Sequence, residues 1–287
     1  MQSFIKPIST RWIFFSMALL GFTVEANDTA SDARIVTAGG SITEIVYALG
    51  AEEQLVAVDT SSLYPVRAMS LPKVGYYRQL NTEGVLSMNP SHVIAASGAG
   101  PQAVLSQIES TGVDITIIDQ PKTVKGIQEL ISAIAAIVGK DVEAKLLNEQ
   151  IEDRVTLLTS SRQSNGEKVV FLMSAGDTGL VAAGDNTIPQ LIMELLDVNN
   201  PFQSLEGFKP VSVEALLAAD PSVILIPEYQ VNGRTKESIC ESNELRFWAK
   251  EHGCQLFFVD SLSFLGLTPR LPNALADTLA ILEDAER

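Results

Sequence analysis

Short apolar runs alternate with amphipathic stretches from Arg34 to the end of the chain. In the first half, apolar runs bounded by turn residues predict strands at 34–38, 55–59, 92–96 and 114–119. Apolar residues that recur at helical spacing predict helices at 42–49, 82–87, 101–111 and 123–138. Strands that alternate with helices in this way are typical of a mostly parallel sheet covered by helices.

The turn after the first predicted strand contains Gly39, Gly40 and Ser41. We expect Ser41 to cap the following helix, and Glu44, three residues later, to complete a capping box. A turn of this kind at a helix N-terminus is able to hold an anion, but tight-turn geometry explains the same residues.

The segment 141–164 is different, because it is polar and charged, lacks Pro and Gly, and keeps helical spacing. A helix of about 22 residues, at about 1.5 Å per residue, spans roughly 33 Å, which suits a rigid connector. A second series of elements follows it. Strands are predicted at 168–173, 223–227 and 255–260, and helices at 187–196, 213–218, 242–251 and 272–285.

The two halves of the chain resemble each other. Residues 81–94 and 211–224 each place a glutamate, Glu83 or Glu214, at the start of a short helix, followed by a Pro turn and an apolar strand. We therefore predict an α/β fold of two Rossmann-like lobes with mostly parallel sheets, joined by one long α-helix, with a ligand cleft between the lobes. The predicted parts are an N-terminal lobe at 27–140, the interlobe helix at 141–164 and a C-terminal lobe at 165–287.

Residues 1–26 have the features of a cleaved export signal. Lys6 and Arg11 precede an apolar run of 13 residues, which ends in small residues before a predicted cut near Ala26. The alternative is a membrane anchor, but a span needs roughly 20 apolar residues. We predict export, and we expect the exported protein not to be embedded in a membrane.

Composition limits the classes of partner. The formal net charge is −15, so nucleic acid and anionic lipid would repel the protein, and most of the charge serves solubility. Cys240 and Cys254 lie in the exported part, where oxidation is permitted. They are candidates for one disulfide, and the sequence leaves the pairing open; their spacing is not that of a metal site.

Signals of an enzyme are weak. The chain has two histidines: His92 opens a predicted strand and His252 lies at a predicted helix end, where structural roles explain both. A nucleophile elbow, a zinc-protease motif and a phosphate-binding loop are all missing from the sequence. We expect no enzymatic activity, with an exported α/β hydrolase as the alternative of another class.

The most informative segment is 73–84, in which Tyr76, Tyr77 and Arg78 lie in a loop before a short helix. A phenolate is a hard anionic ligand that suits ferric iron, and tyrosine is an axial haem ligand in some proteins. An arginine two residues later is placed to pair with a carboxylate. The alternative is a pair of half-buried aromatic residues beside a surface arginine.

Several motifs carry a resemblance over nearly the whole exported chain. Residues 40–45, with 48–50, resemble the opening motif of periplasmic binding proteins that have a single rigid interlobe helix and serve importers of haem, cobalamin and iron–siderophores. Within that class, residues 74–84 resemble the haem-binding members, as do 182–184 and 207–212. The resemblance implies a periplasmic protein that captures haem as its transported ligand, with cobalamin or a ferric siderophore as the alternative cargo.

The resemblance also implies roles for single residues. Tyr76 would be the axial iron ligand, with Tyr77 as the fallback if the register is shifted by one. Arg78 would bind a haem propionate, and Lys209 is a further candidate for a propionate. Some haem-binding relatives add a histidine from the second lobe, but residues 172–177 contain none. The expectation is five-coordinate iron, with Met173 as a weak candidate for the sixth position.

Partners follow from the same resemblance. In this class one acidic residue on each lobe docks to arginines of the membrane permease, and the matching positions are Glu83 and Glu214. Their charge also suits a helix N-terminus, so both roles can hold at once. The expected partners are haem, an ABC permease and its ATPase, and the protein is expected to act as a monomer without nucleic acid.

Overall fold

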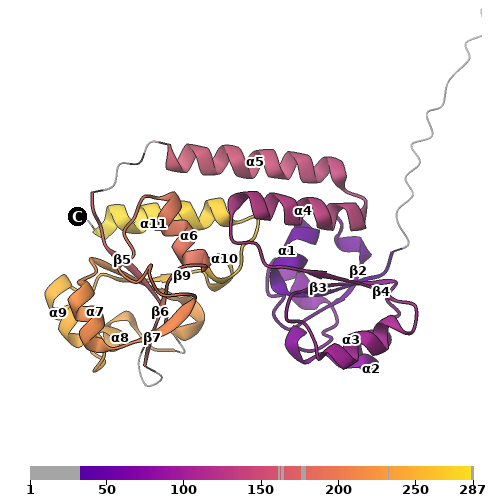
Figure 1. Cartoon of the computed structure of the whole chain (residues 1–287), viewed down its shortest axis with the longest axis horizontal. Coiled ribbons are helices and arrows are strands. Elements are labelled where there is room, and N and C mark those ends of the chain that lie inside the picture. Colours follow the sequence, from indigo (N-terminus) through magenta and orange to yellow (C-terminus); the bar gives the residue numbers. More distant parts are fainter. Residues whose placement is uncertain (1–32, 161, 163–164, 176–178, 232, 286–287) are drawn as a thin grey trace, which may run out of the picture. The chain divides into compact units, whose positions relative to one another are not determined.

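The computed structural model describes residues 33–160, 162, 165–175, 179–231 and 233–285 (Figure 1). Residues 31–287 form one compact unit. The predicted export signal at 1–26 lies outside the described residues. Within the described part of the chain, no helix is both long and apolar enough to cross a bilayer.

The first sheet contains four parallel strands in the order β2-β1-β3-β4. Its strands are β1 (Ile35–Ala38), β2 (Leu55–Val58), β3 (His92–Ala96) and β4 (Asp114–Ile118). Its helices are α1 (Gly40–Ala48), α2 (Thr82–Leu86), α3 (Gln102–Glu109) and α4 (Val124–Val138). The central strands β1 and β3 are almost fully buried, because helices cover both faces of a parallel sheet. We call this sheet and its helices the N-terminal lobe.

The connecting helix, α5 (Asp141–Thr159), packs along α4 and along the last helix, α11 (Leu271–Ala285) (Figure 1). It ends five residues before the predicted boundary at 164, with Ser160 as its C-cap. Ala144, Ile151 and Val155 are its buried positions. A helix that packs on elements of both lobes is a stiff support for them.

The second sheet has the order β7-β6-β5-β8-β9 and is mixed. Strands β5, β8 and β9 are parallel, whereas β6 and β7 pair antiparallel at one side. The bounds are β5 (Val169–Ser174), β6 (Leu180–Ala183), β7 (Phe208–Val211), β8 (Val223–Pro227) and β9 (Leu256–Val259). The prediction of a mostly parallel sheet is therefore confirmed for the first lobe and corrected for this one, which we call the C-terminal lobe.

The helices of the C-terminal lobe are α6 (Ile188–Leu195), α7 (Val213–Ala219), α8 (Lys236–Cys240), α9 (Arg246–His252), α10 (Ser261–Leu265) and α11. Two of them, α6 and α9, are shorter than predicted, whereas α7 and α11 are each one residue longer. The helix predicted at 242–251 begins only at Arg246, and α8 precedes it. A disulfide joins Cys240, at the end of α8, to Cys254, just before β9.

The start of α1 differs from the predicted capping box. Gly39 is the N-cap, with a φ of 142°, and no side chain caps the helix. The Gly39 N–H donates to Asp59 Oδ1 at 3.1 Å and the Gly40 N–H donates to Ser61 Oγ at 3.1 Å. Ser41 is therefore not the cap, and Glu44 is not part of a capping box. The amides of the turn are already bound by the protein's own side chains, so tight-turn geometry is the better interpretation.

Candidate functional site

A cavity of about 440 Å³ lies between the lobes, at the carboxyl ends of the strands. Its N-terminal-lobe lining includes residues at or just after the ends of β1, β2, β3 and β4: Gly39, Ser61, Ala96 and Gln120. The other lobe adds residues that follow β8 and β9: Tyr229 and Ser261. Loops at this end of parallel strands form the ligand crevice in α/β proteins, and the volume is in the range of small-molecule sites.

The tyrosine–arginine segment lies at this cavity. Tyr77 and Arg78 line it, in a short 3₁₀ turn (Tyr77–Gln79) after β2. Arg78 Nε donates to the Tyr77 phenol oxygen at 2.9 Å, and the guanidinium lies 5.0 Å from the centre of that ring. Tyr76 is not among the lining residues, but its ring is 42% exposed and meets the Tyr77 ring edge-on at 4.9 Å. Of the three residues of the predicted cluster, Tyr77 and Arg78 line the cavity and Tyr76 packs beside them.

Burial and charge shift the pKa values of Tyr77 and Arg78, the two groups of the cluster that line the cavity. Burial raises the pKa of the Tyr77 phenol, and the nearby Arg78 charge lowers it by less. The Tyr77 phenol in turn raises the pKa of Arg78. Without a ligand, the pair is therefore a neutral phenol beside a permanent cation. A metal ion would have to displace the phenol proton, whereas Arg78 is ready to receive an anion.

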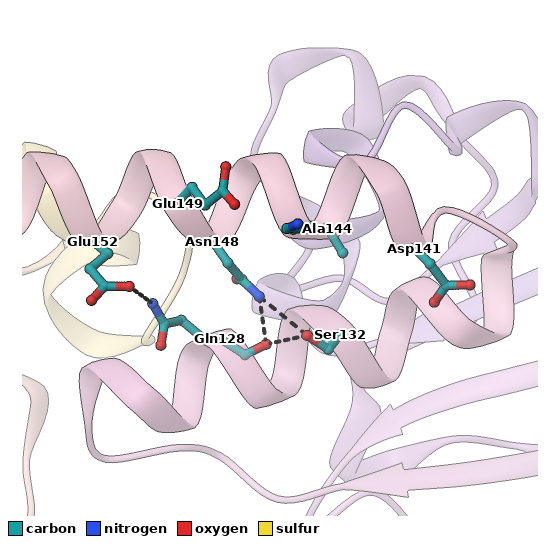
Figure 2. Close-up of a pocket in the computed structure, with 8 residues that line it drawn as sticks. Gln128, Ser132, Asp141, Ala144, Asn148, Glu149 and Glu152 are labelled. Carbon is teal, nitrogen blue, oxygen red and sulfur yellow. Dashed lines mark hydrogen bonds between the residues drawn. The ribbon is translucent and has the colours of Figure 1, made fainter.

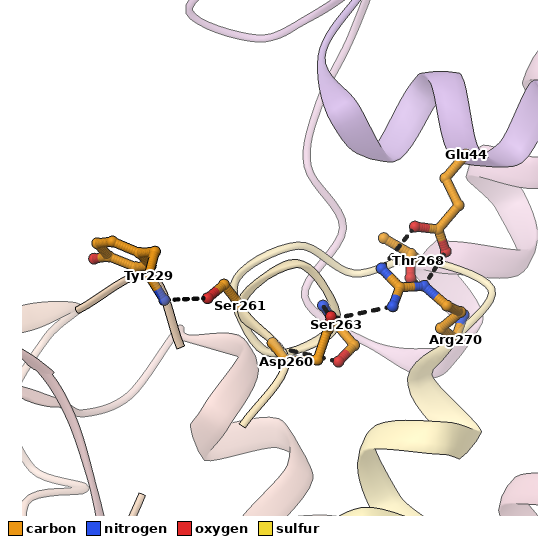
Figure 3. Close-up of polar contacts among 7 residues, drawn as sticks. All are labelled: Glu44, Tyr229, Asp260, Ser261, Ser263, Thr268 and Arg270. Carbon is orange, nitrogen blue, oxygen red and sulfur yellow. Dashed lines mark hydrogen bonds and ion pairs between the residues drawn. The ribbon is translucent and has the colours of Figure 1, made fainter. Parts of the chain in front are cut away.

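The C-terminal lobe contributes an aromatic residue that the sequence interpretation missed. Tyr229 follows β8 and lines the cavity, where it is 46% exposed. Its N–H donates to Ser261 Oγ at 3.1 Å (Figure 3), and its hydroxyl donates to the Met173 carbonyl at 3.4 Å. Met173, the candidate for a sixth iron ligand, does not itself line the cavity. The position of Tyr229 just after a buried strand was the signal that would have identified it.

A three-way ion pair lies beside the cavity, which one of its members, Glu44 of α1, lines. The Arg270 guanidinium donates to Glu44 through Nε and Nη2, at 3.0 Å each, and to Asp260 through Nη1 at 3.0 Å (Figure 3). Burial raises the pKa of Glu44, although Arg270 and the Thr268 hydroxyl act against that shift. Burial also acts to raise the pKa of Asp260, but hydrogen bonds from Ser263 and Arg270 outweigh it and leave the pKa below its usual value. The sequence interpretation did not identify this cluster.

Two predicted docking residues lie on exposed helix starts. Glu83 lies in the first turn of α2, where Asn81 is the cap, and Glu214 lies in the first turn of α7, where Ser212 is the cap. Backbone hydrogen bonding at this helix start, with help from Ser212, lowers the pKa of Glu214. Lys209 is exposed on β7 and does not line the cavity.

The two histidines have structural partners. His92 Nε2 lies 2.8 Å from Thr116 Oγ1 across adjacent strands. His252 Nε2 lies 2.9 Å from Asp220 Oδ1, and its ring stacks on Trp248 at 5.7 Å. Neither histidine lines the cavity. Among the described residues, no group of three or more His, Cys, Asp or Glu side chains is placed to hold a metal ion.

A second hollow, of about 350 Å³, lies between α4 and α5 (Figure 2). Part of its polar lining is hydrogen-bonded between the two helices: Asn148 Nδ2 donates to the Gln128 carbonyl at 3.1 Å and to Ser132 Oγ at 3.2 Å. Gln128 Nε2 donates to Glu152 at 3.3 Å. These contacts join two helices, so we interpret this hollow as the outer part of their packing seam.

Solved structures of heme-binding proteins share this fold over nearly their whole length. The periplasmic heme-binding protein RhuT from Roseiflexus sp. RS-1 is 31% identical, with a TM-score of 0.79, and the match covers 89% of this chain and 99% of that one. HutB, a periplasmic heme-binding protein of Vibrio cholerae, is 30% identical with a TM-score of 0.79, covering 87% and 99%.

A relative found by sequence is named for vitamin B12 binding rather than heme binding. The vitamin B12-binding protein of Vibrio cholerae serotype O1 is 26% identical over 229 residues, which is 79% of this chain and 80% of that protein. The profile of the family described as "Periplasmic binding protein" matches residues 35–246. The family and these structural neighbours are substrate-binding proteins rather than enzymes, which confirms that expectation against the hydrolase alternative. Because the profile spans well over half of the sequence, the chain belongs to the periplasmic binding protein family.

Proposed function

We propose that this protein captures haem in the cavity between its lobes and delivers it to an inner-membrane importer from the periplasm. Periplasmic binding proteins of this family work with an ABC permease and its ATPase. The choice of haem depends on the cluster in which Tyr77 and Arg78 line the carboxyl-end cavity and Tyr76 packs edge-on against Tyr77. Two solved structures that are named for heme binding, RhuT and HutB, are 31% and 30% identical to this chain.

The chemistry of the cavity fits a flat, apolar ligand with carboxylates. Leu63 and Tyr64 on one side and Leu262 and Leu265 on the other offer apolar surface, and burial is worth about 25 cal/mol per Å² of apolar area. Arg78 is mostly solvent-accessible and is placed to pair with a propionate. Lys209, which does not line the cavity, is a weaker candidate for that role.

Tyr76 is our proposed iron ligand, because its ring is exposed beside the cavity while the Tyr77 oxygen is held by Arg78. The Tyr77–Arg78 pair then supports the ligand, since a cation close to a phenolate favours the ionised form that binds ferric iron. Tyr77 is the fallback ligand. Met173 does not line the cavity, so we propose five-coordinate iron.

Glu83 and Glu214 are the proposed contacts with the permease. Each is an exposed carboxylate fixed on the first turn of a helix, one in each lobe. Carboxylates that are held in place lose little freedom when they pair with arginines. Two such points, one per lobe, would let the permease hold both lobes at once.

Cobalamin is the second candidate cargo, favoured by the name of the curated relative. The two candidates separate in one experiment. The purified protein is titrated with hemin, and separately with cobalamin, and binding is followed by the quenching of protein fluorescence. Haem capture predicts tight binding of hemin and none of cobalamin at the same concentration; the reverse result would reject haem and select cobalamin.

A matched pair of variants tests the site in the same titration. Tyr76→Phe removes the proposed ligand oxygen and is expected to weaken hemin binding at least tenfold. Tyr47→Phe removes a phenol oxygen on α1, away from the lining residues, and is expected to bind hemin as the unchanged protein does. Equal affinities of the two variants would contradict the assignment of Tyr76.

A further inference from the structure

The ion pair between Glu44 and Arg270 connects the two lobes directly. Glu44 belongs to α1 of the N-terminal lobe, and Arg270 immediately precedes α11 of the C-terminal lobe, 226 residues later in the sequence. The guanidinium meets the carboxylate with two parallel hydrogen bonds of 3.0 Å each (Figure 3). A fork of this kind fixes direction as well as distance.

Both side chains of this pair are largely buried, so neither charge can be left without its partner. The Glu44 side chain is 4% exposed and that of Arg270 is 14% exposed. A buried charge must be paired, and here one guanidinium serves two carboxylates, because Asp260 takes its third nitrogen. The orientation of Arg270 is thus set from both lobes.

The flat face of Arg270 has a second contact. Its guanidinium carbon lies 3.9 Å from the centre of the Tyr64 ring. Tyr64 and Glu44 both line the cavity. The edge of the guanidinium therefore joins the lobes, and its face supports an aromatic wall of the ligand site. A lysine would supply the charge but neither the fork nor the flat face.

We infer that Arg270 is a positioning residue of the ligand cavity, which holds the two lobes at one separation through Glu44 and holds the Tyr64 ring against the cavity wall. A ligand then meets walls that are already placed, and it does not have to order them on binding. The ligand readout below depends on the proposed haem capture, whereas the distance readout does not depend on any ligand.

The test compares Arg270→Gln with a control variant. The control breaks an ion pair of similar burial between two residues that are only five positions apart in the sequence. Arg162 pairs with Glu167 at 2.9 Å, and their side chains are 12% and 11% exposed. Arg162→Gln should therefore reduce thermal stability without moving the lobes. Arg270→Lys is the milder second variant, for use if Arg270→Gln does not fold.

Two measurements are made on each variant. The first is the distance between spin labels placed at Ser110→Cys and Glu251→Cys, one exposed position on each lobe, without ligand. The second is the dissociation rate of hemin. Arg270→Gln is expected to broaden the distance distribution and to raise the hemin dissociation rate at least tenfold. Arg270→Lys is expected to raise the dissociation rate at least threefold. The control is expected to change neither.

Three results would overturn the inference or separate it from the proposed function. Unchanged distances and rates in Arg270→Gln would show an ion pair that serves only stability. Equal increases in Arg162→Gln would assign the effect to lost stability in general. If the unchanged protein does not bind hemin, the proposed cargo is rejected, and the distance distribution alone decides the role of Arg270.

Discussion

Replacing Arg270 with glutamine should lower the free energy of unfolding more than replacing Glu44 with glutamine does, although both changes break the same ion pair. Without Arg270, the carboxylates of Glu44 and Asp260 lose their shared cation and remain close to each other. Breaking a buried pair in this way costs about 3–5 kcal/mol, because an uncompensated charge stays buried.

Replacing Glu44 instead leaves the remaining charges, Arg270 and Asp260, paired. After Glu44→Gln, Arg270 keeps its hydrogen bond to Asp260, and the amide oxygen of glutamine still accepts one bond. Burial already raises the pKa of Glu44, so its ionised form is costly in the folded protein. The expected loss is about 1–2 kcal/mol, in the range of one impaired hydrogen bond.

The assay is urea unfolding at about pH 8, followed by circular dichroism on the single variants, the double variant and the unchanged protein. The double variant should lose less than the sum of the two single losses, because each change removes the same contact. Equal losses for the two single variants, or a strictly additive double variant, would refute the assignment of Arg270 as the shared cation.

Further predictions concern three separate features. Replacing both Cys240 and Cys254 with serine should lower the free energy of unfolding by about 3 kcal/mol, the value for a loop of roughly 15 residues, as measured by urea unfolding. Burial lowers the pKa of His92 below 6.5, so the unfolded chain binds the proton more readily, and stability should fall as pH drops through that window. His92→Asn should show a smaller fall between about pH 7.5 and pH 5.5 in the urea midpoint. Changing Glu83 and Glu214 together to glutamine should leave hemin affinity unchanged and reduce stimulation of the importer's ATPase at least tenfold; equal stimulation would contradict the docking role.

Much of the N-terminal lobe could be predicted because its strands are continuous apolar runs between turn residues. The strand at 92–96 coincides with β3, and the predicted helix at 123–138 differs from α4 by one residue. Buried parallel strands leave this signal because both of their faces are covered. Local pattern is therefore a reliable guide where burial is complete.

The C-terminal lobe was harder, for physical reasons that particular elements illustrate. Strand β7, at the edge of the sheet, contains an exposed Lys and Pro among its four residues. Such a short edge strand has neither a long apolar run nor a clear alternation, and Pro is tolerated only because the edge needs no donor there. The antiparallel side of this sheet was missed for that reason.

The candidate site was partly visible in the sequence. Tyr77 and Arg78 are adjacent, so their proximity required no knowledge of the fold. Glu44 was misinterpreted, because its position three residues after Ser41 fits a capping box equally well. Its true partner, Arg270, lies 226 residues away, and no local pattern reports a contact that only the assembled lobes create.

We propose that a tyrosine oxygen of this cluster binds the iron of haem between the two lobes. The most direct test is the absorption and resonance Raman spectrum of the ferric haem complex of the unchanged protein, of Tyr76→Phe and of Tyr77→Phe. We expect the spectrum of a five-coordinate, high-spin iron with a phenolate ligand, which is lost in Tyr76→Phe and kept in Tyr77→Phe. A phenolate spectrum that survives in both variants would contradict it.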